Sequence, residues 1–238
     1  MIYFVIPTYN ESKNLKHLVS GIDKTFAGKL YRILIVDDNS PDGTARIAEK
    51  LAKHYPIEVL HRPEKQGLGS AYIAGFRSVL KSKPDLIFSM DADFSHDPAS
   101  LPAFLEASKI YHVVVGSRYI SGGKIKNWSL YRAFISKCAN SLTRMLLHLS
   151  PRDVTSMYRC YRLEVLKSVD FSKISSSGYF FCEELLWHCA HKGFTIGEVP
   201  ITYMQRKHGK SKLDWKEIAA SFWMLIRLRF ILKSMSKK

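Results

Sequence analysis

Two aspartates, Asp91 and Asp93, stand two positions apart directly after the apolar run 86–90. Carboxylates that leave a buried strand at this spacing can bind one hard divalent cation, because Mg²⁺ and Mn²⁺ take oxygen ligands and share them with substrate phosphates. A solvated turn is the plain alternative for a single pair of this kind. A calcium-binding EF-hand loop is disfavoured, since its sixth position would be His96 instead of glycine and its twelfth Pro102 instead of glutamate.

A second acidic cluster, residues 37–40 (DDNS), follows the apolar run 31–36. A carboxylate here can accept hydrogen bonds from a nucleobase or a ribose, whereas Asp42 or Ser40 can equally cap the next helix. A dinucleotide-binding site is excluded because no G-x-G-x-x-G follows the first apolar run, where the chain reads PTYNE. Gly67 and Gly69 precede a helical pattern and are better explained by a turn and by close packing.

These polar clusters lie between segments that alternate between strand and helix patterns. Apolar strands are predicted at residues 2–7, 31–37, 57–61, 86–91 and 113–117, and amphipathic helices at 11–24, 44–54, 69–81 and 98–108. This alternation predicts an α/β fold with a mostly parallel central sheet flanked by helices. Ligands bind such sheets at the carboxyl ends of the strands. Polar residues follow four of these ends, at 8–11, 37–40, 91–93 and 117–118, which predicts one composite site.

The second half of the chain is less regular. Helices are predicted over residues 130–149, 183–192 and 216–233, strands over 195–199 and 201–205, and a basic turn over 206–212. The four cysteines have no CxxC spacing. They therefore predict reduced thiols, and not a zinc site or a disulfide framework.

The formal net charge of +15 is concentrated in two segments. Residues 107–152 carry eight basic side chains and no acidic one, and residues 203–238 carry ten basic and two acidic side chains. Two basic segments on a nearly neutral body predict a polyanionic partner, which can be a phosphate, a nucleic acid or an anionic lipid. The hydrophobic content of 46% suits one globular domain and excludes a disordered chain.

Five motifs in order make the chain similar to the family-2 glycosyltransferases, and within them to the dolichyl- or polyprenyl-phosphate mannosyltransferases. They are residues 6–11 (IPTYNE), 36–44 (VDDNSPDGT), 65–69 (KQGLG), 90–96 (MDADFSH) and 116–119 (GSRY). Residues 197–201 (GEVPI) and 206–212 (RKHGKSK) extend the resemblance to about residue 212.

The resemblance implies a GT-A fold with a nucleotide-sugar site and a bound Mg²⁺ or Mn²⁺. The nucleotide-sugar-binding positions would be Pro7, Tyr9, Glu11, Val36, Asp38, Asp91, Ala92, Asp93, Arg206 and Lys212, the last two on a mobile loop over the donor phosphates. The acceptor phosphate would face Arg118, Arg132 and Ser136. Asp91 and Asp93 would hold the metal and, with Arg118, form the catalytic set.

The resemblance also implies the reaction. A hexose, namely mannose from GDP-mannose, would be transferred onto a polyprenyl or dolichyl monophosphate with inversion at the anomeric carbon. The departing nucleoside diphosphate builds negative charge, which a divalent cation, Arg206 and Lys212 would stabilise. An acceptor phosphate is already anionic and needs orientation more than a general base. The chain departs from its relatives at Ser95, where some carry Gln, in residues 156–159 (SMYR), where SGFR is usual, and at Cys182, where Gln is common. The last two bear on sugar and acceptor specificity.

Residues 218–232 form an apolar segment interrupted by Ser221, Arg227 and Arg229. It is shorter than the about 20 residues that span a bilayer, and central arginines disfavour spanning. We therefore expect a catalytic domain over residues 1–214, followed over 215–238 by an interfacial or partner-docking helix with a basic tail. A core helix is the alternative. Because the N-terminus lacks a signal-peptide pattern, the expected location is peripheral, on the cytoplasmic face of a membrane, where a membrane-embedded partner is a further option.

Two other functions stay open. A family-2 enzyme could instead use a UDP-sugar, for glucosyl or GlcNAc transfer to polyprenyl phosphate or to a glycan. The net charge also fits a nucleic-acid-binding module, although no RNP, zinc-finger or helix-turn-helix signature is present, so no nucleic-acid partner is expected. A catalytically silent subunit is disfavoured by the intact Asp91, Asp93 and Arg118.

Overall fold

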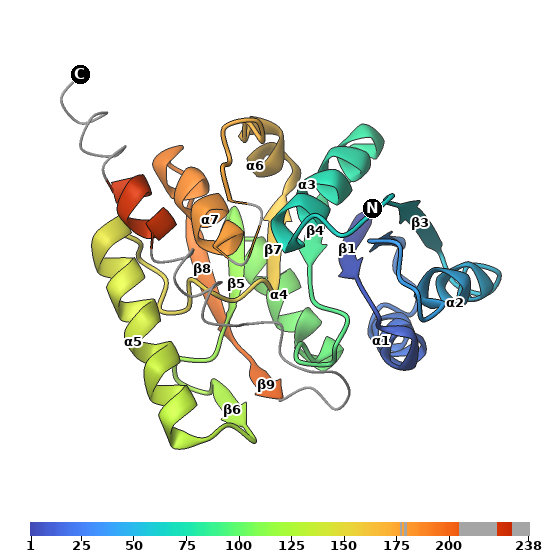
Figure 1. Cartoon of the computed structure of the whole chain (residues 1–238), viewed down its shortest axis with the longest axis horizontal. Coiled ribbons are helices and arrows are strands. Elements are labelled where there is room, and N and C mark those ends of the chain that lie inside the picture. Colours follow the sequence, from blue (N-terminus) through green and yellow to red (C-terminus); the bar gives the residue numbers. More distant parts are fainter. Residues whose placement is uncertain (177, 179, 205–222, 230–238) are drawn as a thin grey trace.

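A seven-stranded sheet runs through the middle of the protein in the order β3-β2-β1-β4-β7-β5-β8 (Figure 1). The structure is a computed structural model that describes residues 1–176, 178, 180–204 and 223–229. The strands of this sheet are β1 (Ile2–Thr8), β2 (Tyr31–Asp37), β3 (Ile57–His61), β4 (Leu86–Ser89), β5 (Val113–Ser117), β7 (Arg159–Arg162) and β8 (Ile196–Pro200). A small second sheet pairs β6 (Lys124–Lys126) with β9 (Thr202–Met204).

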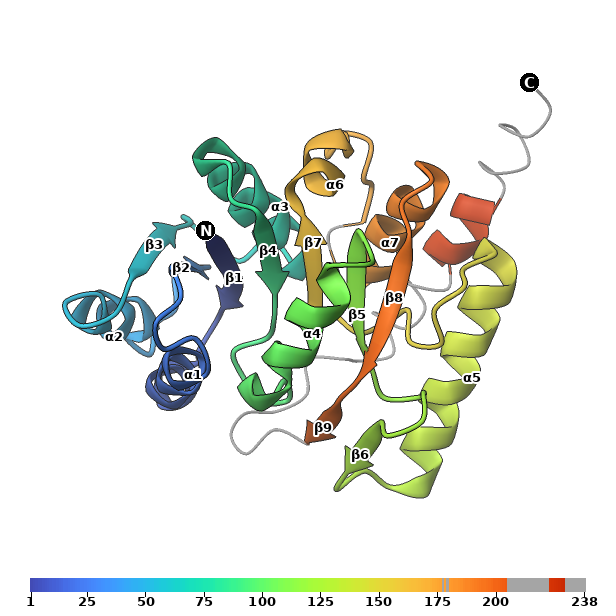
Figure 2. The same ribbon diagram turned by 180° about the vertical axis from the view of Figure 1, so that it is seen from behind.

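Helices cover both faces of the sheet (Figures 1 and 2). They are α1 (Ser12–Thr25), α2 (Thr44–Leu51), α3 (Leu68–Val79), α4 (Leu101–Ser108), α5 (Leu130–Leu147), α6 (Leu163–Ser168) and α7 (Phe181–His191), with short 3-10 turns η1 (Leu80–Ser82) and η2 (Pro98–Ser100). Side chains alternate along β1, so Val5 belongs to the core cluster that includes residues of α3, α6 and α7, while Phe4 belongs to the cluster that includes residues of α1 and α4. The strands are therefore apolar on both sides, and the predicted α/β fold is confirmed.

The sheet is parallel except for β7, which runs antiparallel between β4 and β5. The sequence pattern did not predict this strand, because its four residues, RCYR, include two arginines. Arg159 is nevertheless fully buried, since its guanidinium donates to the backbone oxygens of Cys182 at 2.6 Å and Val154 at 2.7 Å. These bonds satisfy a charge that an apolar strand could not otherwise accommodate.

The strand register brings the predicted polar clusters to one edge of the sheet. β1 and β2 pair in parallel from Ile2 opposite Tyr31 to Thr8 opposite Asp37, so both strands end together. β4 pairs with β1 up to Val5 opposite Ser89, which places the segment after β4 beside the end of β1. The predicted composite site thus has its geometric basis in the parallel pairing.

Helix α5 carries an unusual amount of exposed apolar surface. Its exposed side chains, here called the apolar face of α5, are Leu130, Tyr131, Phe134, Ile135, Leu142 and Met145. Nearby, residues 223–229 are helical and bury Leu225 and Leu228 in the core, while Trp223 is 68% exposed. Among the described residues, no helix is long and apolar enough to cross a membrane. The rest of the segment 215–238 lies outside the described residues, so the predicted interfacial helix there stays a prediction.

Candidate functional site

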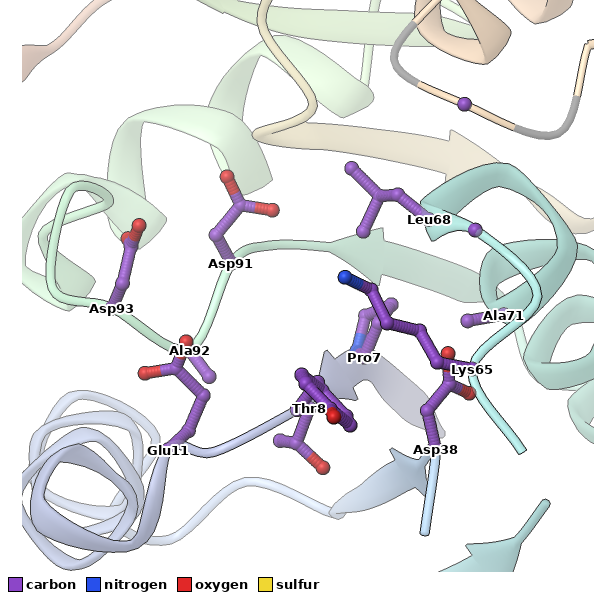
Figure 3. A pocket seen from close by; sticks show the side chains of 13 residues that line it. Pro7, Thr8, Glu11, Asp38, Lys65, Leu68, Ala71, Asp91, Ala92 and Asp93 are labelled. Atoms are coloured by element: carbon purple, nitrogen blue, oxygen red, sulfur yellow. The ribbon is translucent and has the colours of Figure 1, made fainter. Parts of the chain in front are cut away.

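A pocket opens at the carboxyl edge of β1, β2 and β4 (Figure 3). Its lining comes from five separate segments and consists of Pro7, Thr8, Tyr9, Glu11, Asp38, Lys65, Gly67, Leu68, Ala71, Asp91, Ala92, Asp93 and Gly178. Figure 3 shows the carboxylates of Glu11, Asp91 and Asp93 gathered on one side, and Asp38 and Lys65 on the other. The pocket is therefore divided into two chemically different halves.

Asp91 is held from two sides. Its backbone N–H donates to Nδ1 of His96 at 2.9 Å, and its Oδ1 accepts a hydrogen bond from the hydroxyl of Tyr72 at 3.2 Å. His96 is buried and stacked on Tyr158, with ring centroids 4.8 Å apart. Burial lowers the pKa of His96 despite the nearby Asp91 and Asp93, so the ring is neutral and serves as an acceptor. The carboxylate is therefore oriented before any ligand arrives.

Asp93 and Glu11 are oriented by local hydrogen bonds. Asp93 Oδ1 accepts from the backbone N–H of Ser95 at 3.0 Å and from its hydroxyl at 2.6 Å. Glu11 Oε2 accepts from Nδ2 of Asn14 at 2.8 Å, one turn along α1. These bonds direct two carboxylates from different segments into the same half of the pocket.

The carboxylates fit a hard divalent cation. The described lining carries four carboxylates, Glu11, Asp38, Asp91 and Asp93, and one ammonium group, that of Lys65. Such a pocket would repel a diphosphate unless a cation were bound with it. The described residues contain no group of three or more His, Cys, Asp or Glu suited to a metal. A pair of carboxylates is nevertheless what Mg²⁺ uses when substrate phosphates and water complete its shell.

The two aspartates at the end of β2 have different environments. Asp37 is satisfied internally, since its carboxylate accepts from the hydroxyls of Thr8 at 2.9 Å and Ser40 at 2.6 Å. Asp38 turns into the pocket and pairs with Nη1 of Arg62 at 2.7 Å. Asp42 accepts from the backbone N–H of Thr44 at the start of α2, although the N-cap position itself is Gly43. Asp38 is therefore the carboxylate of this cluster that can meet a ligand.

The glycines before α3 have the structural role expected from the sequence. Gly67 has φ +96°, a conformation that favours glycine, and it starts the helix. A Cβ on Gly69 would lie 2.7 Å from Cβ of Phe181, so this glycine allows α3 to pack against α7. Lys65, just before them, places its Nζ 4.9 Å above the ring of Tyr9.

A second group of residues surrounds Arg118, which follows β5. Its Nε and Nη2 donate to the two carboxylate oxygens of Asp153, each at 2.7 Å, and its backbone N–H donates to the same carboxylate at 3.0 Å. Asp153 is fully buried, and the Arg118 side chain is nearly so. Burial lowers the pKa of Arg118, but the pair with Asp153 outweighs it and the net shift is upward. Arg118 is thus a fixed cation with Nη1 outside the pair.

Arg132 and Ser136 of α5 lie close to Arg118 through shared neighbours. Arg118 and Arg132 both lie over the ring of Trp128, at 5.8 and 4.3 Å from its centroid. The hydroxyl of Tyr119, the residue after Arg118, donates to Ser136 Oγ at 2.8 Å. The structure therefore brings the three predicted acceptor-site residues together, and we call Arg118, Arg132, Ser136, Tyr119 and Trp128 the acceptor cluster.

Tyr203 connects the acceptor cluster to the loop that carries Asp91 and Asp93. Its ring lies 5.3 Å from the guanidinium of Arg118 and packs edge-on against Trp128. The same ring lies 6.2 Å from the ring of His96, whose Nδ1 bonds the backbone of Asp91. The pocket and the acceptor cluster are thus connected through two rings, those of His96 and Tyr203.

Comparison with known families identifies the protein. The profile of the family described as "Glycosyl transferase family 2" matches residues 3–170. The chain belongs to glycosyl transferase family 2. Among its relatives, this family-2 chain is 42% identical to the polyprenol monophosphomannose synthase of Mycolicibacterium smegmatis, over 90% of this chain and 81% of that protein. It is also 42% identical to the undecaprenyl-phosphate mannosyltransferase of Micrococcus luteus, over 88% of this chain and 86% of that protein.

A third relative is longer. The chain is 39% identical to the dolichol-phosphate mannosyltransferase of Pyrococcus furiosus over 90% of its own length, but spans 59% of that protein. Among solved structures, glucosyl-3-phosphoglycerate synthase from Mycobacterium tuberculosis, in complex with Mn²⁺, UDP and phosphoglyceric acid, superimposes with a TM-score of 0.70 at 18% identity. That match covers 95% of this chain and 76% of the other. The GT-A fold of this family-2 glycosyltransferase is thereby confirmed.

The predicted donor residues are found in different places. Pro7, Tyr9, Glu11, Asp38, Asp91, Ala92 and Asp93 line the pocket. Val36 does not line it, because its side chain is buried between the sheet and α3. Arg206 and Lys212 lie outside the described residues. The roles assigned to all of these residues stay predictions.

Three charged residues of the site were missed from the sequence. Lys65 and Arg62 follow β3, and Asp153 precedes β7. The strand-end rule, applied to β3 as to the other predicted strands of the first half, leads to Arg62 and Lys65. Asp153 had no local signal, because it lies 35 positions from Arg118 in the chain.

Proposed function

We propose that this family-2 glycosyltransferase moves mannose from GDP-mannose to a polyprenyl or dolichyl monophosphate, with inversion at the anomeric carbon. The observation that carries the proposal is the pairing of an acidic pocket with a cationic cluster across Tyr203. Three relatives at 39–42% identity, named as mannosyltransferases or mannose synthases of polyprenol or dolichol phosphates, support the same substrates.

In the donor half, Asp91 and Asp93 would hold Mg²⁺ or Mn²⁺. The bound metal would supply neutralising charge to the diphosphate as it leaves with the nucleoside. Tyr72 and His96 hold Asp91 in place, and Ser95 holds Asp93, so the carboxylates need little reorganisation. Asp38 and Tyr9 lie in the other half of the pocket, where they would contact the nucleoside. Arg206 and Lys212 are proposed to close over the donor phosphates.

In the acceptor half, Arg118 and Arg132 would bind the lipid phosphate and aim one of its oxygens at the anomeric carbon. Asp153 leaves Nη1 of Arg118 outside the ion pair, and Trp128 supports both guanidinium groups. A phosphate oxygen is ionised at neutral pH and attacks without a general base, so orientation and charge are the main requirements. Attack from the face opposite the leaving group gives inversion.

The exposed apolar face of α5 supports a peripheral position on a membrane. Its apolar face includes Leu130 at 90%, Tyr131 at 72% and Phe134 at 67% exposure, and the basic residues Lys124, Lys126 and Lys137 lie on or next to this helix. Apolar side chains with flanking cations suit the interface of an anionic bilayer. Ser136, on the same helix, belongs to the acceptor cluster, so this placement brings the lipid phosphate to the site.

Transfer of labelled mannose tests the reaction. The purified protein should transfer label from GDP-mannose to undecaprenyl phosphate in the presence of Mn²⁺ or Mg²⁺, and lose this activity in EDTA. UDP-glucose and UDP-GlcNAc serve as competing donors. Transfer from a UDP-sugar but not from GDP-mannose would overturn the donor assignment, and full activity in EDTA would overturn the role of the metal.

Vesicle binding tests the docking surface. Phe134→Ser with Met145→Ser should weaken binding to vesicles that contain anionic lipid, because two exposed apolar groups are lost. Leu30→Ser is the matched control, since Leu30 is 71% exposed away from α5. Transfer to a short, soluble acceptor analogue should be unchanged in both variants. Equal vesicle binding by all three proteins would remove α5 as the docking surface.

A further inference from the structure

Arg62 stands directly behind the carboxylate of Asp38. It is the first residue after β3, and its backbone N–H donates to the backbone carbonyl oxygen of Asp37 at 2.8 Å. Its Nη1 donates to Asp38 Oδ1 at 2.7 Å, and its Nη2 donates to Ser70 Oγ at 2.6 Å and Gln66 Oε1 at 3.1 Å. The guanidinium is therefore anchored at three side chains, and it is only 9% exposed.

Arg62 favours the charged form of Asp38, although the net shift of the Asp38 pKa is upward because of burial. Burial raises the pKa of Asp38, and the neighbouring Asp37 adds to the rise, whereas Arg62 and Lys65 lower it. Arg62 is the closer of these two cations, since it makes a direct hydrogen bond. An ionised carboxylate is an acceptor only, but a protonated one is also a donor. Arg62 therefore influences, from outside the pocket, whether Asp38 acts only as a hydrogen-bond acceptor or also as a donor.

We propose that Arg62 is a positioning residue for nucleobase selection, which fixes Asp38 as an ionised acceptor with Oδ2 available to a ring N–H of the base. The inference rests on the proposed function in one respect, namely that the pocket takes a nucleoside diphosphate. Arg62 itself does not line the pocket. It acts on the ligand only through Asp38.

The chemistry of the bases gives this arrangement a selectivity. Guanine and uracil carry a ring N–H on their pairing edge, at N1 and N3 respectively. Adenine and cytosine carry an unprotonated ring nitrogen at the equivalent place, which would face the carboxylate as a second acceptor. Two acceptors face to face leave both unpaired, and a buried unpaired polar group is costly. The site therefore favours guanosine and uridine diphosphates over those of adenosine and cytidine.

Calorimetric titration with Mn²⁺ present tests the proposal. Dissociation constants for GDP, ADP and pyrophosphate are measured for the wild type, Arg62→Gln and Arg32→Gln. Arg32 is a matched control because it pairs with Glu58 at 2.8 Å on the same sheet, outside the pocket. Arg62→Gln should weaken the binding of GDP by about tenfold, as expected for the loss of a hydrogen bond to a charged group. The dissociation constant for pyrophosphate should change by no more than about twofold. The difference in affinity between GDP and ADP should therefore become smaller.

The pH dependence separates positioning from a general loss of structure. In Arg62→Gln the pKa of Asp38 rises further, so GDP binding should fall from about pH 8 to about pH 6 while ADP binding does not. Wild type and Arg32→Gln should be flat over this range. Arg62→Lys keeps the positive charge but lacks the planar guanidinium with its several N–H donors. It should therefore recover the flat pH profile but only part of the affinity for GDP.

Ser70→Ala with Gln66→Ala keeps the proposal testable if the arginine variants do not fold. This double variant removes the two side-chain acceptors of Arg62 Nη2. It should weaken the binding of GDP by a few-fold and leave the binding of pyrophosphate unchanged. The proposal is overturned if Arg62→Gln binds GDP as the wild type does, or if GDP and pyrophosphate weaken equally. A wild-type protein that binds UDP but not GDP would overturn the mannose donor alone, because Arg62 would then be tested on UDP.

Discussion

The donor pocket and the acceptor cluster each contain a buried carboxylate–guanidinium pair. The two pairs have opposite orientations, because the carboxylate is nearer to the site in one and the guanidinium in the other. In the pocket Asp38 faces the cavity and Arg62 stands behind it. In the acceptor cluster Arg118 lies against Trp128 and Tyr203, and Asp153 stands behind it. The member in front would match the ligand proposed for each site, since a base offers N–H donors and a phosphate offers anionic oxygens.

The two pairs also differ in how they are supported. Arg62 is anchored by Ser70 and Gln66 near the surface, whereas Asp153 is fully buried and its backbone N–H donates to Glu198 at 3.1 Å. A charge that is removed from water depends more strongly on its partner. We therefore expect loss of the rear residue to affect mainly binding in the donor half, but stability in the acceptor half.

Removal of Asp153 should have the largest effect. Asp153→Ala leaves the guanidinium of Arg118 buried without its carboxylate, which should lower the free energy of unfolding by about 3–5 kcal/mol. Urea denaturation measures this change. Arg32→Ala is the control, because it breaks the exposed pair with Glu58 and should cost no more than about 1 kcal/mol. A small loss for Asp153→Ala would mean that the acceptor pair is solvated like a surface pair.

Asp93→Asn should affect catalysis without a comparable loss of stability, since Asp93 is a proposed metal ligand in the donor half and its hydrogen bonds from Ser95 lie within one loop. We expect kcat to fall by about 10²–10³-fold, the scale seen when one electrostatic contact to a developing charge is removed. Asp170→Asn is a matched control, because Asp170 accepts from the N–H and hydroxyl of Ser172 as Asp93 does from Ser95, but on the surface. Mannose transfer by each variant is the readout.

Glu183 extends the comparison because it is a buried carboxyl group that forms no ion pair among the described residues. Burial raises its pKa from 4.5 to about 7, and its Oε2 accepts no hydrogen bond there. The folded state therefore holds a proton that the unfolded chain has lost, so stability falls as pH rises from about 4.5 to about 7. Glu183→Gln should be more stable than the wild type at about pH 8, by on the order of 1–3 kcal/mol, and similar at about pH 4.

The neighbouring Glu184 serves as the control for this experiment. Its carboxylate accepts from the backbone N–H groups of Ser175 and Ser176, at 3.0 and 2.9 Å. Glu184→Gln removes one of these acceptors and should lower stability at both pH values. Thermal unfolding at each pH gives the comparison, and a destabilised Glu183→Gln at about pH 8 would show that the carboxylate has a partner after all.

Arg132→Ala should have the smallest effect. Arg132 is a guanidinium of the acceptor cluster that stacks on Trp128 and makes no buried ion pair among the described residues. Its loss should raise KM for lipid phosphate by about tenfold, since a charge-assisted hydrogen bond is removed, and leave the Kd for GDP unchanged. An equal loss in both constants would place Arg132 in the donor half.

The donor half was predictable from the sequence, and the acceptor half was only partly so. Apolar runs located β2, β3 and β5 to the residue, because strands buried on both faces leave a continuous pattern. The strand-end rule then led to Asp38 and Asp91. The β7 strand and the pair of Arg118 with Asp153 were not predictable in this way, because they depend on contacts between residues far apart in the chain.

A protein held on a bilayer by the apolar face of α5 meets its lipid acceptor in two dimensions. The acceptor concentration that governs turnover is then its mole fraction in the membrane, and not its amount per volume of suspension. Dilution of the suspension with buffer would leave the rate per bound enzyme unchanged, whereas dilution of the acceptor with inert lipid would lower it. Ser136 lies on the same helix as this apolar face, so the headgroup would reach the site while its chain stays in the membrane.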